Sequence, residues 1–149
     1  MIDLQLAIVH HVLVFTLVAL IAVEFVLFRP HLDAAAIRML SRIDAGYGAV
    51  AGLVIAIGIL RVIYGAKGPD FYLGNPWFWG KMAALLAIGL ISIVPTVALL
   101  RWRRASKTEP SFVPPADAHR RARGHIALEL ALVPVVLICA AAMARYGSL

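Results

Sequence analysis

Long hydrophobic runs with few polar interruptions dominate the chain and determine the fold that it predicts. Four runs occupy, within a few residues, the ranges 6–28, 43–64, 78–100 and 126–146. A stretch of about 20 apolar residues forms a helix long enough to cross a hydrocarbon layer of about 30 Å. The pattern therefore predicts an all-helical integral membrane protein, in which residues 1–149 form one domain with four transmembrane helices.

The polar segments between the runs predict how the bundle is oriented. Ten of the 14 Lys and Arg residues lie in two segments, 29–42 and 101–124, which emerge on the same side of the membrane. The positive-inside rule assigns that side to the cytoplasm, so both termini should face outward. We expect this membrane to be the bacterial inner membrane. The segment 101–124, which combines prolines with charges, is expected to be a mobile cytoplasmic loop.

The composition excludes several other classes of protein. Hydrophobic residues make up 62% of the chain and charged residues 15%, whereas about a quarter of the residues of a soluble domain are charged. The net charge of +6 is explained by the cytoplasmic segments, so no nucleic-acid partner is expected. The single cysteine, Cys139, excludes an internal disulfide and the CxxCH motif that attaches c-type haem. Other side chains must therefore hold any cofactor.

Three ionisable residues near the outer ends of the runs suggest a cofactor site. His10, Arg61 and Lys81 each lie about one helical turn from that end, so we expect them at one level. A neutral imidazole can ligate iron or copper, and Arg and Lys can pair with carboxylates such as the propionates of haem b. His10 is the predicted metal ligand, and His11 is a second candidate for the site. In the alternative interpretation, His10 is structural and the two cations extend to the interface.

Three acidic residues lie toward the opposite ends of the runs, at Glu24, Asp44 and Glu129. A carboxylate in hydrocarbon is costly, so each is a candidate for a functional role. We predict that they handle protons, with Glu24 and Glu129 as the deeper members of a relay. A metal site is one alternative. Ion pairs with arginines of the basic segments are another, the candidates being Arg38, Arg42 and Arg123.

Small residues recur at intervals of four in the second run, at Gly48, Gly52 and Ala56. This spacing places them along one helical face, where the backbone of a neighbouring helix can approach closely. The pattern predicts that this face packs against another helix.

Several short motifs resemble those of a known family. They are His10-His11, Gly58-x-x-Arg61, Asn75-Pro76-x-Phe78-x-x-Lys81 and Pro95-Thr96, together with Glu24 and Asp44. Over nearly its whole length, the chain resembles the bacterial predicted membrane proteins called domain of unknown function 2214. That name implies a membrane location and no activity.

A more remote resemblance links the chain to HemJ-type protoporphyrinogen oxidases and to the membrane domain of copper-resistance D proteins. HemJ-type proteins have an early histidine and a Trp-x-x-x-Lys motif, which His10 or His11 and Trp77 with Lys81 match here. Because those proteins are associated with haem b, the resemblance implies that this chain binds haem b. Phe15-Thr16 stands in place of their Trp-Phe signature, so protoporphyrinogen oxidation is not implied.

The preferred interpretation is an inner-membrane protein that binds haem b or a related redox cofactor. It would transfer electrons or act as an oxidoreductase linked to quinone or porphyrin, and we expect it to be a homo-oligomer in the lipid bilayer. Two alternatives remain open. One is a transporter or channel for a small anion or a metal ion, and the other is a structural membrane subunit.

Overall fold

The chain folds into four long helices and one short helix in a computed structural model that describes residues 2–109 and 111–146. The elements are α1 (Ile2–Leu27), α2 (Ala34–Tyr64), α3 (Gly68–Leu73), α4 (Pro76–Thr108) and α5 (Ala116–Arg145). Each of the four long helices is long and apolar enough to cross a membrane, and the described residues include no strand. The predicted all-helical bundle with four spans is therefore confirmed.

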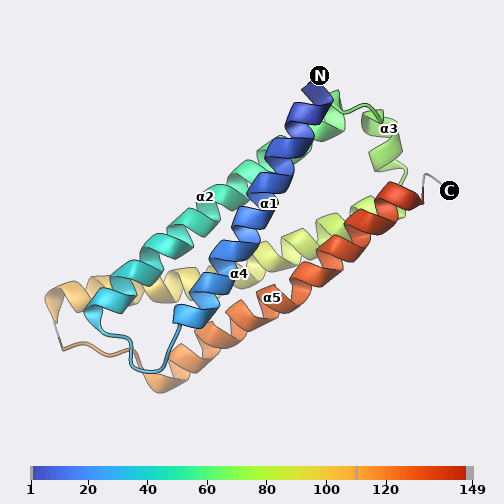
Figure 1. Cartoon of the computed structure of the whole chain (residues 1–149). Coiled ribbons are helices and arrows are strands. Elements are labelled where there is room, and N and C mark those ends of the chain that lie inside the picture. Colours follow the sequence, from blue (N-terminus) through green and yellow to red (C-terminus); the bar gives the residue numbers. More distant parts are fainter. Residues whose placement is uncertain (1, 110, 147–149) are drawn as a thin grey trace.

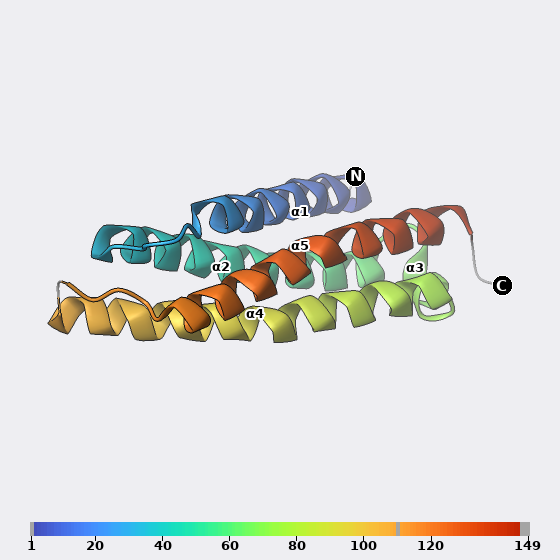
Figure 2. The same ribbon diagram turned by 90° about the horizontal axis from the view of Figure 1, so that it is seen from below.

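The long helices form two antiparallel hairpins, α1 with α2 and α4 with α5 (Figure 1). The hairpins contact each other through α2 and α4 and through α1 and α5. Helix α3 and the start of α1 lie at one end of the bundle, which we call the α3 end (Figures 1 and 2). The chain passes from α1 to α2 and from α4 to α5 at the opposite end. We call this the basic end, and the positive-inside rule predicts that it faces the cytoplasm.

A cluster of buried hydrophobic residues lies in the half of the bundle nearer the basic end. There, Phe28 packs between Trp102 of α4 and His119 of α5, with ring centroids 5.9 and 5.0 Å away. The other members of this hydrophobic cluster are Ile21, Leu32, Ile37, Leu40, Tyr47, Leu99, Ala122 and Ile126. Many other large apolar side chains are exposed, which is expected of helices surrounded by hydrocarbon.

The prediction that 101–124 is a loop is wrong for most of that segment. Helix α4 continues through 101–108, and α5 already begins at residue 116. Hydropathy marks where a helix leaves the hydrocarbon and not where the helix ends. The Arg, Lys and Ala residues at these positions favour helix. With 33 residues, α4 is about 50 Å long, well beyond the hydrocarbon thickness of about 30 Å.

The small-residue face at Gly48, Gly52 and Ala56 meets no other helix among the described residues of this chain, so the predicted packing against a neighbouring helix remains a prediction. All three residues are exposed, and a Cβ added at either glycine would meet no atom within 4 Å. The packed face of α2 instead carries Asp44 and Tyr47. A spacing of four defines a stripe on a helix, but it does not say which stripe faces the bundle.

Candidate functional site

Two groups of ionisable side chains lie inside the bundle at different levels. His10, Arg61 and Lys81, from α1, α2 and α4, form the cationic cluster near the α3 end. Glu24, Asp44 and Glu129, from α1, α2 and α5, form the carboxylate cluster nearer the basic end. His10 and Glu24 are 14 residues apart on α1, which corresponds to about 21 Å along the helix. The two clusters are therefore separate sites.

The cationic cluster brings together the three residues that helical phase and depth predict. Arg61 and Lys81 lie close enough to His10 for their charges to act on it, and all three side chains are partly buried. His10 Nδ1 and Arg61 Nε are buried, and neither atom has a hydrogen-bond partner in the part of the chain that the structure describes. The Lys81 ammonium lies 5.5 Å from the ring centroid of Phe78. These groups remain able to bind an acceptor or a ligand.

Gly58 allows α2 to pass close to the imidazole of this cluster. A Cβ at position 58 would lie 3.5 Å from His10 Cε1, in ordinary van der Waals contact. Alanine would therefore fit there, whereas a longer side chain would compete with the imidazole for space. Gly58 precedes Arg61 by three residues, so the motif Gly58-x-x-Arg61 places the small residue and the cation on one face.

His11 lies outside the cationic cluster. It is exposed, and its Nδ1 donates a hydrogen bond to the carbonyl oxygen of Ala7 at 2.6 Å. Its ring is nearly perpendicular to that of His10, at a centroid distance of 6.3 Å. Trp77, the other residue matched to the HemJ-type pattern, is 40% exposed. Of the two histidines, His10 is the one that lies near Arg61 and Lys81 inside the bundle.

The carboxylate cluster has members on α1, α2 and α5, and α4 contributes a hydrogen-bond donor to it. Glu24, Asp44 and Glu129 have exposed fractions of 2%, 7% and 2%. The hydroxyl of Tyr47 on α2 donates to Glu129 Oε2 at 3.0 Å, and that of Thr96 on α4 donates to Asp44 Oδ1 at 2.6 Å. Glu24 Oε1 is buried, and the described residues offer it no hydrogen-bond partner.

The ion pairs considered for these carboxylates are absent from the described residues. The salt bridge found among the described residues joins Arg120 to Asp117 on the exposed surface of α5. Arg38 and Arg42 are exposed, and Arg123 donates to backbone carbonyl oxygens instead. The alternative of a metal site has no support either, because the same residues contain no group of three His, Cys, Asp or Glu that could hold a metal ion.

Sequence reasoning did not identify the two hydroxyl donors of the carboxylate cluster. Tyr47 lies three residues after Asp44, on the same face of α2, and this spacing indicates that its hydroxyl lies near the carboxylate cluster. Thr96 follows Pro95 in α4, and its partner Asp44 is 52 residues away in the chain. A hydroxyl in an apolar run carries no charge and is therefore easily overlooked.

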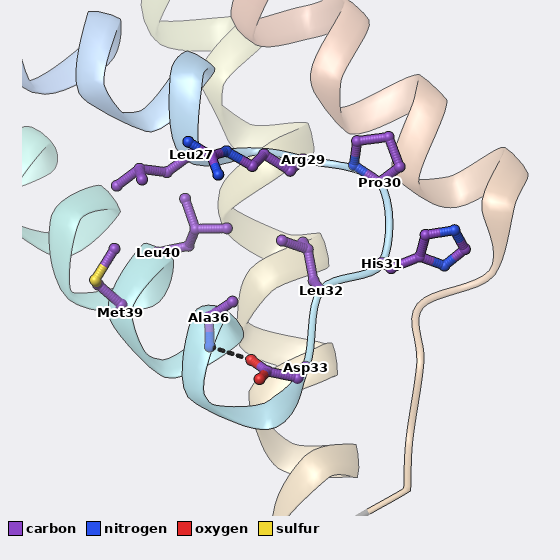
Figure 3. A pocket seen from close by; sticks show the side chains of 9 residues that line it. All are labelled: Leu27, Arg29, Pro30, His31, Leu32, Asp33, Ala36, Met39 and Leu40. Atoms are coloured by element: carbon purple, nitrogen blue, oxygen red, sulfur yellow. Dashed lines mark hydrogen bonds between the residues drawn. The ribbon is translucent and has the colours of Figure 1, made fainter.

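A pocket of about 310 Å³ lies at the basic end, away from both clusters (Figure 3). The connection between α1 and α2 forms much of its wall, including Arg29, His31 and Asp33. Asp33 caps α2 by accepting a hydrogen bond from the backbone N–H of Ala36 at 2.7 Å. His31 has a φ of 64°, which turns the connection tightly. No member of either cluster lines this pocket.

Comparison with known proteins identifies a family for this chain. The model of a family described as a predicted membrane protein (DUF2214) matches residues 2–147. The chain matches no curated protein and no solved structure. The family description supports a membrane location and names no activity. A function must therefore be argued from the two clusters themselves.

Proposed function

We propose that this chain, which belongs to the DUF2214 family of predicted membrane proteins, is a haem b-binding protein of the bacterial inner membrane. The observation that carries this proposal is the cationic cluster. An imidazole lies beside two cations, and both His10 Nδ1 and Arg61 Nε are buried without a partner in the described chain. An imidazole and two cations suit an iron porphyrin that carries two carboxylates.

Each residue of the cationic cluster would have a distinct part in holding haem b. His10 would provide the imidazole ligand, while Arg61 and Lys81 would neutralise the propionates. When bound, the haem supplies one-electron chemistry, tuned by its ligand and surroundings. His11 lies on an exposed face, so we assign the ligand role to His10 alone.

The carboxylate cluster supports a role in moving the protons that accompany electron transfer. Glu24 and Glu129 are the most buried ionisable residues that the structure describes, and the buried Asp44 accepts a hydrogen bond from Thr96 of α4. We propose a quinone in the bilayer, or a porphyrin, as the redox partner. A homo-oligomer remains our expectation for the assembly.

The test of haem binding is an absorbance spectrum of the purified protein, oxidised and then reduced with dithionite, with a pyridine haemochrome assay. We expect a Soret band from the wild type and none from His10→Ala. The matched control, His11→Ala, should keep the band, because His11 faces away from the cluster. Arg61→Gln or Lys81→Gln should weaken haem affinity about tenfold, since each removes a charged pairing.

Two results would contradict the proposal. One is a wild-type spectrum without a Soret band after expression with haem supplementation. The other is full haem retention by His10→Ala. Circular dichroism of each variant, compared with the wild type, shows that any loss of haem occurs in a folded protein.

A further inference from the structure

The carboxylate cluster holds more negative charge than its surroundings offset. Three carboxyl groups from three helices lie within a membrane-spanning bundle, and each is more than nine-tenths buried. A buried carboxylate costs several kcal/mol unless a cation or hydrogen bonds compensate it. Two hydroxyl donors, those of Tyr47 and Thr96, serve the three groups.

Glu24 is the least compensated member of the cluster. Its side chain is 2% exposed, and its Oε1 has no hydrogen-bond partner among the described residues. It lies close enough to Asp44 and Glu129 for the three charges to interact. The unpartnered oxygen thus belongs to a carboxyl group on which the charges of two further carboxyl groups act. Carboxyl groups that interact in a low-dielectric site disfavour one another's ionisation, so one of them tends to stay protonated.

Among the residues that the structure describes, no cation pairs with a carboxylate of the cluster. Arg123 and His125 are the basic residues of α5 that precede Glu129 most closely in sequence. The Arg123 guanidinium donates instead to the carbonyl oxygens of Phe25 and Phe28 at 3.3 and 2.5 Å. His125 Nδ1 donates to the carbonyl oxygen of Arg121 on its own helix. The titratable groups that face Glu24 are therefore Asp44 and Tyr47 from α2 and Glu129 from α5, while α4 contributes the neutral Thr96.

We propose that Glu24, Asp44 and Glu129 form an intramembrane proton-binding site, which holds a proton at neutral pH and exchanges it with water at the basic end. A proton is the cation that fits. It needs one carboxyl oxygen, and Glu24 Oε1 is free to take it. A metal ion needs several convergent ligands, and the described residues provide no such group. On exchange, the proton leaves the carboxylic acid for water, a carboxylate remains, and no electrons move.

The surroundings of the cluster point to the basic end as the route of exchange. Ser41 is buried one turn closer to that end, on the same face of α2 as Asp44, and offers a hydroxyl oxygen on the way. In the other direction, the face continues with the apolar Val54 before it reaches Gly58. The 11 residues from Tyr47 to Gly58 cover about 16 Å, too far for a hydrogen bond to the cationic cluster. The proton site therefore extends the proton role proposed above, but it does not depend on haem binding.

Infrared difference spectroscopy of the full chain in lipid nanodiscs tests the proposal, by comparing neutral with strongly alkaline buffer. At neutral pH the wild type should show the carbonyl stretch of a protonated carboxylic acid, and transfer to deuterated buffer should shift it. The isosteric variant Glu24→Gln should lose this band. Glu109→Gln, which alters an exposed carboxylate just after α4, is the matched control and should keep it. Circular dichroism confirms that each variant is folded.

Three results would overturn the proton site. They are a wild type without the band at neutral pH, a band unchanged in all of Glu24→Gln, Asp44→Asn and Glu129→Gln, and a stoichiometric metal that Glu24→Gln removes from the protein. Loss of the band in any one of the three cluster variants supports the site. The same measurement on His10→Ala separates the two proposals, since the band should persist there whether or not the protein binds haem.

Discussion

Replacing Arg123 by Ala is expected to lower the free energy of unfolding by about 3 kcal/mol, because charge-assisted hydrogen bonds contribute about 1.5–3 kcal/mol each. Its guanidinium donates to the carbonyl oxygens of Phe25, in the last turn of α1, and of Phe28, directly after α1. Helix α1 has no basic residue in its own last turn, so a cation from α5 compensates the negative end of its dipole. The guanidinium also lies 4.4 Å from the ring centroid of Phe25.

The destabilisation can be measured by titrating the purified protein with SDS and following helix loss by circular dichroism. Arg121→Ala is the matched control, because Arg121 lies two residues away on the same helix and its side chain is exposed. Arg123→Lys should give an intermediate value, since an ammonium keeps the charge but lacks the planar fork. Equal stability of Arg123→Ala and Arg121→Ala would show that the contact with α1 contributes nothing.

Hydropathy and helical phase predict the depth and direction of a side chain in a membrane helix. This is why the cationic cluster could be predicted from the sequence. The bilayer fixes the length of each apolar run, so His10, Arg61 and Lys81 could be placed at one level. The angle of 100° per residue then separated His10 from His11. Both parts of the prediction use information within one helix, and the structure indeed brings the three residues together.

Contacts that depend on how two helices cross cannot be predicted from hydropathy and helical phase. Arg123 was considered as a partner for buried carboxylates, yet it reaches carbonyl groups 95 and 98 residues away in the chain. The bond from Tyr47 to Glu129 spans 82 residues. Both contacts depend on where α5 crosses α1 and α2, and apolar surfaces in lipid specify such crossings only weakly. The spacing of Gly48 and Gly52 likewise does not tell whether their stripe faces the bundle, and in this chain it is exposed.

Replacing Asn75 by Ala should destabilise the α3 end by about 3 kcal/mol, the sum of a lost helix cap and a carbonyl group left without its donor. Asn75 has an exposed fraction of 0%. Its Oδ1 accepts a hydrogen bond from the backbone N–H of Trp77 at 3.0 Å, which caps α4 just before Pro76. Its Nδ2 donates to the carbonyl oxygen of Tyr146 at 2.9 Å, which joins the start of α4 to the end of α5.

Asn75→Ser separates the two contributions, because serine can still cap α4 but is too short to reach Tyr146. We expect it to cost about 2 kcal/mol, leaving a difference of about 1 kcal/mol from Ala for the cap. The same SDS titration measures both variants, and hydrogen exchange of the last turn of α5 reports the lost bond directly. If Asn75→Ser is as stable as the wild type, the hydrogen bond from the Asn75 amide to Tyr146 contributes nothing to stability. Asn75 would then act only as the cap of α4.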